Sequence, residues 1–208
     1  MKHLFIPAKI IPEINIKKII GISKNIPKRL AIAYSIQFQD TALKIKKILS
    51  STHEITDFMQ VLGCTTLNLK NTDAVLLIGS GRFHALSIAY SSKMPVYILN
   101  KDSLDRIGKS DTDFLLKKQK AACMKFLSQK NIGILISTKQ GQQKLSEAIK
   151  LKKKLKHKNF YLFLSNDIDT REFENFGLKS YVNTACPRLD FDSSIINIRD
   201  VQKLDISD

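Results

Sequence analysis

An alternation of short, continuously apolar runs with longer amphipathic stretches constrains the fold of this chain more than any other feature of its sequence. The apolar runs are expected to be strands, and they occupy residues 30–35, 74–79, 95–99, 132–137, 160–164 and 180–184. A strand that is apolar on both faces needs cover on both faces, which helices provide in parallel sheets. The pattern therefore predicts an α/β fold of mainly parallel sheets flanked by helices.

Amphipathic stretches between these runs are expected to be helices at residues 40–49, 83–90, 113–129, 141–157 and 170–176. On the stretch 141–157, one face is expected to be buried and consists of Leu145, Ala148, Ile149 and Leu155. A polar segment at 101–113 separates two similar series of strands and helices. We therefore expect two tandem small domains, 1–110 and 111–208, with a boundary near Ser110.

Basic residues dominate the charge of the 208-residue chain, with 34 Lys and Arg against 19 Asp and Glu and a net charge of +15. Such a surface attracts polyanions, so RNA binding is one interpretation, and it rests on charge alone. The richness in Lys and Ile equally fits a compositional bias of the source genome. No apolar run reaches the roughly 18 residues of a membrane span, and the start lacks signal-peptide features. A cytoplasmic location is therefore expected.

Two strand-to-helix turns contain residues suited to ligand binding. Residues 79–84 read Gly-Ser-Gly-Arg-Phe-His, and the glycines let backbone N–H groups approach an anionic ligand. A dinucleotide-binding fingerprint would need a third glycine where His84 stands. Residues 137–142 read Ser-Thr-Lys-Gln-Gly-Gln and lack the spacing of a Walker A loop. Both turns also fit a purely structural role, as a tight turn or a helix cap.

The three cysteines are too far apart for a C-x-x-C site and cannot all pair in disulfides. Cys64 and Cys186 each follow an apolar run and a small residue, so both are expected in loops at strand ends. Each is interpreted either as a small buried hydrophobe or as a ligand that the fold brings to a site. Cys123 is expected to pack in the core, on one helix face with Leu116, Phe126 and Leu127. The four histidines show no zinc-site spacing.

Six segments form an ordered series across nearly the whole chain. They are residues 5–9 (FIPAK), 34–38 (YSIQF), 61–64 (VLGC), 79–84 (GSGRFH), 136–142 (ISTKQGQ) and 182–189 (VNTACPRL). Together they resemble the diphthamide-synthesis radical enzyme family, the 2-(3-amino-3-carboxypropyl)histidine synthases. Cys64 and Cys186 stand at the positions of that family's second and third cluster cysteines. Ser80 replaces the middle glycine of the family's G-G-G-R-F-H turn.

This resemblance implies a [4Fe-4S] cluster held by one cysteine from each of three similar α/β domains, with S-adenosylmethionine as co-substrate. The implied activity is transfer of a 3-amino-3-carboxypropyl group to a histidine of translation elongation factor 2, the first step of diphthamide biosynthesis. Cys64 and Cys186 then become the expected metal ligands. Substrate contacts are expected at Gly79, Gly81, Arg82, Phe83, His84, Lys139 and Gln142. Arg82 is expected either to grip a substrate carboxylate or to pair with a structural acid.

The resemblance begins at the family's second domain, so a separate chain is expected to supply the first domain and its cysteine. A split enzyme is therefore our expectation, and homodimerisation or pairing with a paralogous subunit in a heterodimer stays open as well. The alternative that stays open is a non-catalytic accessory subunit, which would keep the fold and bind the elongation factor through its basic surface.

Overall fold

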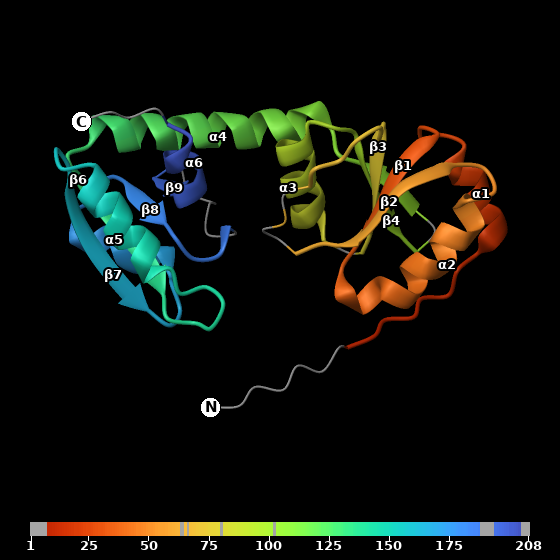
Figure 1. Ribbon diagram of the computed structural model, residues 1–208, viewed down its shortest axis with the longest axis horizontal. Helices are drawn as coiled ribbons and strands as arrows, with labels where there is room; N and C mark the ends of the chain where they lie inside the picture. Colours follow the sequence, from red (N-terminus) through yellow and green to blue (C-terminus); the bar gives the residue numbers. More distant parts are fainter. Residues whose placement is uncertain are drawn as a thin grey trace. The chain divides into compact units, whose positions relative to one another are not determined.

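The computed structural model of the chain describes residues 8–62, 65, 67–79, 81–101, 103–187 and 194–204. Two compact units make up the chain, Met1–Asp113 and Phe114–Asp208, and each contains one sheet (Figure 1). The division between the units lies within helix α4 (Lys109–Ser128), near the boundary expected at Ser110. Within the described ranges, no helix is both long and apolar enough to cross a membrane.

The first unit is built on a five-stranded sheet in the order β2-β1-β3-β4-β5. Its strands are β1 (Arg29–Tyr34), β2 (Glu54–Gln60), β3 (Ala74–Ile78), β4 (Val96–Asn100) and β5 (Ser103–Arg106). The first four strands pair in parallel, whereas β5 runs antiparallel to β4 at one edge. β1 and β3 are buried along almost their whole length, as their continuous apolar runs predict.

Helices cover both faces of this first sheet. They are α1 (Ile16–Ser23), the 3-10 helix η1 (Ile36–Phe38), α2 (Gln39–Leu49) and α3 (Arg82–Ser92). Alternate side chains of β1 point to opposite faces, so Leu30 and Ile32 pack in the cluster that includes α1 and α2. Ala31 and Ala33 pack instead in the cluster that includes α3. Figure 1 shows α3 on the side of the sheet away from α1 and α2.

The second unit is built on a four-stranded, fully parallel sheet in the order β7-β6-β8-β9. Its elements are β6 (Asn131–Ser137), α5 (Leu145–Lys154), β7 (Asn159–Ser165), the 3-10 helix η2 (Thr170–Phe176), β8 (Tyr181–Asn183), β9 (Ile195–Asn197) and α6 (Ile198–Gln202). Phe126, Ile134 and Ala148 form part of the core between this sheet and its helices. On the other face, the Tyr181 ring fills the space beside Gly133, where a Cβ would lie 2.3 Å from it. The expected α/β fold of two small, mainly parallel sheets is confirmed.

Six elements lie outside the sequence prediction, namely the helices α1, η1 and α6 and the strands β2, β5 and β9. β2 reads Glu-Ile-Thr-Asp-Phe-Met-Gln and β5 reads Ser-Leu-Asp-Arg, so neither contains a continuous apolar run. β2 and β5 stand at the edges of the first sheet, where polar side chains reach water, whereas β9, at an edge of the second sheet, is buried but only three residues long. A search for buried apolar runs therefore finds the central strands and the apolar edge strand β7, and misses edge strands that are polar or very short.

Two expectations about helix faces are wrong. α5 is shorter than expected at both ends, and Ile149 on it is 39% exposed rather than buried. In α4, Leu116 and Leu127 are 40% and 49% exposed, although Phe126 is buried and Cys123 packs against the core as expected. A sheet covers only a stripe along each helix, so apolar residues beside that stripe remain in contact with water.

A buried lysine connects the end of α4 with the start of β7. Lys158 is 8% exposed, and its ammonium donates hydrogen bonds to the carbonyls of Phe126, Leu127 and Gln129 at 3.0, 3.1 and 2.8 Å. Carbonyls at a helix C-terminus lack partners within the helix and attract positive charge. Burial lowers the pKa of Lys158 below its ordinary value of 10.5. The ammonium therefore satisfies the carbonyls at the end of the helix, although its own desolvation costs free energy.

We predict that Lys158→Met lowers the free energy of unfolding by about 2 kcal/mol, because buried carbonyls lose their donor. Between the native pKa and 10.5, the unfolded chain binds more protons than the native chain, so the stability contributed by Lys158 rises with pH. The loss caused by the variant should therefore grow as the pH is raised toward 10.5. Urea unfolding at several pH values measures the free energy of unfolding, and Lys152→Met, at an exposed position, is the control. Equal losses for both variants, or a loss that shrinks with pH, would contradict this prediction.

Candidate functional site

The carboxyl edge of the second sheet gathers three polar loops, because β6, β7 and β8 are parallel neighbours. Ser137, Ser165 and Asn183 are the last residues of these strands. Parallel strands deliver the loops that follow them to the same edge of a sheet, where ligands bind in folds of this class. The turn at 137–142 and the loop of Cys186 therefore lie on one edge.

Cys186 lies in the loop after β8, as expected, and its thiol is half-buried and free. The loop is tied to β6 through Thr184, whose N–H and hydroxyl both donate to the Leu135 carbonyl at 3.0 and 2.8 Å. Asn183 closes the loop: its amide oxygen accepts the Ala185 N–H at 2.9 Å, and its amide nitrogen donates to the Cys186 carbonyl at 2.8 Å. The thiol therefore lies on a turn that is hydrogen-bonded both to β6 and to the side chain of Asn183.

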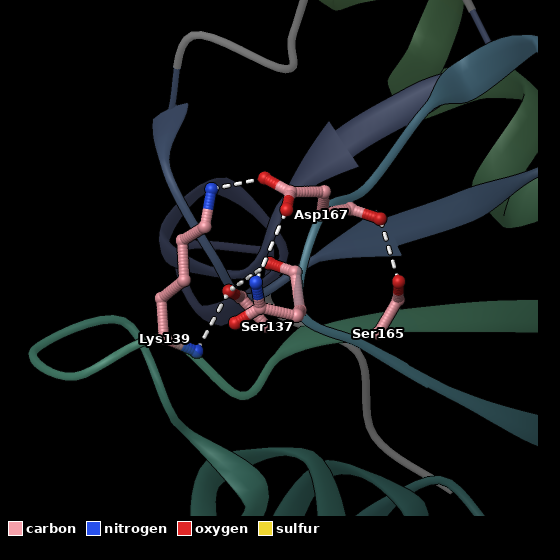
Figure 2. A network of polar contacts seen from close by, with 5 residues as sticks. Ser137, Lys139, Ser165 and Asp167 are labelled. Atoms are coloured by element: carbon pink, nitrogen blue, oxygen red, sulfur yellow. Dashed lines mark hydrogen bonds and ion pairs between the residues drawn. The ribbon is translucent and has the colours of Figure 1, made fainter.

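Lys139 stands at the centre of a polar network on the same edge (Figure 2). Its ammonium forms an ion pair with Asp167, and its backbone N–H donates to the Ser137 hydroxyl at 3.1 Å. The buried Ser137 hydroxyl donates to the Asn166 carbonyl at 3.3 Å. Ser165 donates to the Asp167 carbonyl at 2.6 Å. These contacts join the turn after β6 to the loop after β7.

The ion pair places the Lys139 ammonium at this edge of the sheet, where the Asp167 carboxylate partly neutralises its charge. The hydrogen bond and the charge of Lys139 hold the pKa of Asp167 below its ordinary range. Both side chains are substantially exposed, so water screens their attraction. Gln142 closes the same turn by donating its N–H to the Lys139 carbonyl at 3.0 Å.

The carboxyl edge of the first sheet gathers the ends of β1, β2 and β3. Gly79, at the end of β3, has a φ of +155°, and a Cβ there would lie 3.1 Å from the Ser35 hydroxyl at the end of β1. Glycine therefore lets the two strand ends approach closely. The expected ligand Cys64 and its neighbour Gly63 lie outside the described residues, as does Ser80 of the turn.

The first turn of α3 contains the other expected contacts of this unit, Arg82, Phe83 and His84, after Gly81 as the N-cap. A Cβ on Gly81 would lie 2.5 Å from Nδ1 of His84, so the imidazole packs directly against the glycine backbone. The Phe83 and His84 rings meet edge to face with centroids 5.9 Å apart. The turn is therefore compact, with both aromatic rings half-buried.

Arg82 is paired with an acid, which is one of its two expected roles. Its Nη2 donates to Asp111 at 2.8 Å, and the same carboxylate accepts the Gly108 N–H at 3.1 Å. These two donors hold the pKa of Asp111 below its ordinary range. The Arg82 side chain is nevertheless 61% exposed. Asp111 therefore orients the guanidinium without covering it.

The chemistry of the Cys186 thiol fits a role as one ligand of a thiolate-bound cofactor. Across the described ranges, no group of three His, Cys, Asp or Glu side chains could hold a metal ion. A half-buried thiol on an ordered strand-end loop is instead suited to be one ligand of an iron–sulfur cluster, for which thiolates are the usual ligands.

Comparison with known proteins agrees with the fold and with these loops. A family model described as "Putative diphthamide synthesis protein" matches residues 1–195. This chain belongs to that family. The matched range contains the turns at 79–84 and 137–142 and the loop of Cys186, so the resemblance read from the six segments is confirmed.

Relatives and solved structures define the extent of the likeness. The 2-(3-amino-3-carboxypropyl)histidine synthase of Methanocaldococcus jannaschii is 31% identical, over 94% of this chain and 58% of the relative. Subunit 1 of the synthase of Encephalitozoon cuniculi is 24% identical, over 82% of this chain and 53% of that protein. Dph2 from Pyrococcus horikoshii, solved with a 4Fe-4S cluster, has a TM-score of 0.77 at 26% identity, covering 90% of this chain and 60% of that one. The chain thus spans little more than half the length of these relatives.

Sequence reasoning missed the partners of the site residues, namely Asp111, Asp167 and Asn183. An Asn at the end of an apolar run is a known signal for a side chain that bonds the backbone two residues on, so Asn183 could have been found. Asp111 and Asp167 lie far along the chain from Arg82 and Lys139, and nothing local marks them as partners.

We predict that Lys139→Met raises the pKa of Asp167 toward its ordinary value, because the carboxylate loses its cationic donor. Carboxyl-carbon NMR titration of the folded protein measures this value. Lys144→Met is the matched control, since Lys144 pairs with Glu147 on the same unit and should leave Asp167 unchanged. An Asp167 pKa that is the same in the wild type and in Lys139→Met would contradict the ion pair.

Proposed function

We propose that this chain forms part of a [4Fe-4S]-dependent enzyme that transfers the 3-amino-3-carboxypropyl group of S-adenosylmethionine to a histidine of translation elongation factor 2. This reaction would be the first step of diphthamide biosynthesis. The observation that carries the proposal is the family match over residues 1–195, together with the place of Cys186 on a hydrogen-bonded turn at the carboxyl edge of a parallel sheet. The relatives named as synthases and the cluster in the solved Dph2 support it.

Cys64 and Cys186 are the proposed cluster ligands within this chain, and a third cysteine is proposed to come from a separate chain. When bound, the reduced cluster supplies the electron that cleaves the Cγ–S bond of S-adenosylmethionine. Cys123 is a poor ligand candidate, because it lies inside α4 and packs against the core. The task proposed for the protein is to present these thiolates to the cluster and to bind the substrates.

The turns at 79–84 and 137–142 are the proposed substrate-binding segments. Arg82 is oriented by Asp111 and largely exposed, so its remaining N–H groups can grip a carboxylate. Lys139 can exchange Asp167 for a substrate carboxylate, since water already screens that pair. The other proposed contacts are Gly79, Gly81, Phe83, His84 and Gln142.

The cluster is tested by anaerobic iron and sulfide quantitation with electron paramagnetic resonance, on the chain alone and after co-expression with a candidate chain that supplies the third cysteine. We predict a full cluster only in the pair, and its loss in Cys64→Ala and in Cys186→Ala. Cys123→Ala is the matched control and should retain the cluster.

Two results would contradict parts of this proposal. Four irons per molecule of the chain alone would show that no ligand comes from a second chain. A pair without any cluster would favour a non-catalytic accessory subunit, which should still bind the elongation factor.

Arg82→Lys is predicted to raise the KM for S-adenosylmethionine about tenfold in the reconstituted pair, because an ammonium cannot bind a carboxylate in bidentate fashion. Arg29→Lys is the matched control. Arg29 pairs with Asp73 at 2.7 Å, but at the start of β1, the opposite edge of the same sheet. Equal KM values for the two variants would contradict the proposed role of Arg82 in binding the substrate.

A further inference from the structure

Asn183 is a buried amide in a position where an apolar residue would be the ordinary choice. It is the last residue of β8 and is 1% exposed. In the sheet its neighbours in register are Leu135 of β6 and Asn197 of β9. Burying an amide costs free energy unless its hydrogen-bonding groups find partners. The presence of Asn183 at this place therefore calls for a compensating set of contacts.

The amide has those contacts, and they converge on the Cys186 loop. The nitrogen donates to the Cys186 carbonyl and to the Asn197 side-chain oxygen, both at 2.8 Å. The oxygen accepts the Ala185 N–H at 2.9 Å. Because Ala185 can only donate from its N–H and the Cys186 carbonyl can only accept, a single orientation of the amide satisfies both.

Asn197 connects this loop to the next strand. It is the last residue of β9 and the N-cap of α6, yet its side chain makes no capping bond to that helix. Its oxygen accepts from Asn183 instead. The Cys186 loop is therefore held from two neighbouring strands, by Thr184 on β6 and by the Asn183–Asn197 pair on β9.

We propose that Asn183 is a positioning residue, which with Asn197 sets the position of the Cys186 thiol for binding the cluster. That Cys186 is a cluster ligand rests on the proposed function, whereas the effect of Asn183 on the position of the Cys186 thiol does not. Asn183 acts through the loop backbone, at the Ala185 N–H and the Cys186 carbonyl, so its effect should appear in the reactivity of Cys186 without iron as well as in iron binding.

Asn183→Asp tests the inference with little change in side-chain size. The carboxylate still accepts from Ala185, but it cannot donate, and it faces the Cys186 carbonyl and the Asn197 oxygen. We expect alkylation of Cys186 by iodoacetamide to become about fivefold faster, measured by peptide mass spectrometry against Cys123 in the same molecules. Iron release to a chelator from the reconstituted pair should accelerate by a similar factor.

The matched control is Asn159→Asp. Asn159 donates to the Asn131 side-chain oxygen at 2.9 Å, so it forms the same kind of Asn–Asn pair, but in an exposed place where β6 and β7 begin. This variant should leave the alkylation rate of Cys186 within about twofold of the wild type. An unchanged rate in a folded Asn183→Asp protein, or an equal change in both variants, would overturn the inference.

Two substitutions of Asn197 decide the question if Asn183→Asp does not fold. Asn197→Leu removes the acceptor for Asn183 and should accelerate Cys186 alkylation, whereas Asn197→Asp retains an acceptor and should stay close to the wild type. Equal rates for these two variants would overturn the inference. If the wild-type pair takes up no iron, the proposed function fails, and so does the inference that Asn183 positions a cluster ligand. The alkylation rates still test whether Asn183 controls the position of the Cys186 thiol.

Discussion

The parallel register of β6 with β7 and β8 is the constraint on which the candidate site of the second unit depends. Each of these strands ends at the same edge, so a turn, an acidic loop and a cysteine loop from distant parts of the chain become neighbours. Packing enforces the register, because a shift by one residue would exchange the two buried faces of β6 and move a side chain into the space beside Gly133 that the Tyr181 ring fills.

Where the strand ladder stops, side chains take over the hydrogen bonding of the backbone. The Thr184 hydroxyl donates to the Leu135 carbonyl, and the Ser137 hydroxyl accepts from the Lys139 N–H. The Asn183 amide accepts from the Ala185 N–H and donates to the Cys186 carbonyl. Backbone groups left without partners at a buried edge would cost free energy, so these polar residues stabilise the loops and at the same time limit their motion. A rigid loop is what a ligand to a cofactor requires.

The first unit uses the same principle with different groups. Gly79 permits close packing of two strand ends, and the Gly108 N–H and Arg82 share the Asp111 carboxylate. In both units a basic side chain proposed for substrate binding is oriented by an acid from another segment. The fold shared with the solved Dph2 agrees with an arrangement in which the sheets place the loops at their carboxyl edges.

The amino-acid sequence by itself determined the central strands, the longer helices that connect them, and the loop position of Cys186, because continuous apolar runs and strand-end residues are local signals. It also contained the segments that indicate the family. Edge strands such as β2 stayed hidden, since half-exposed strands lack an apolar run. The pairs Arg82–Asp111, Lys139–Asp167 and Asn183–Asn197 were decided only by the tertiary structure. Each joins residues from separate elements, and only strand order and register bring such residues within hydrogen-bonding distance.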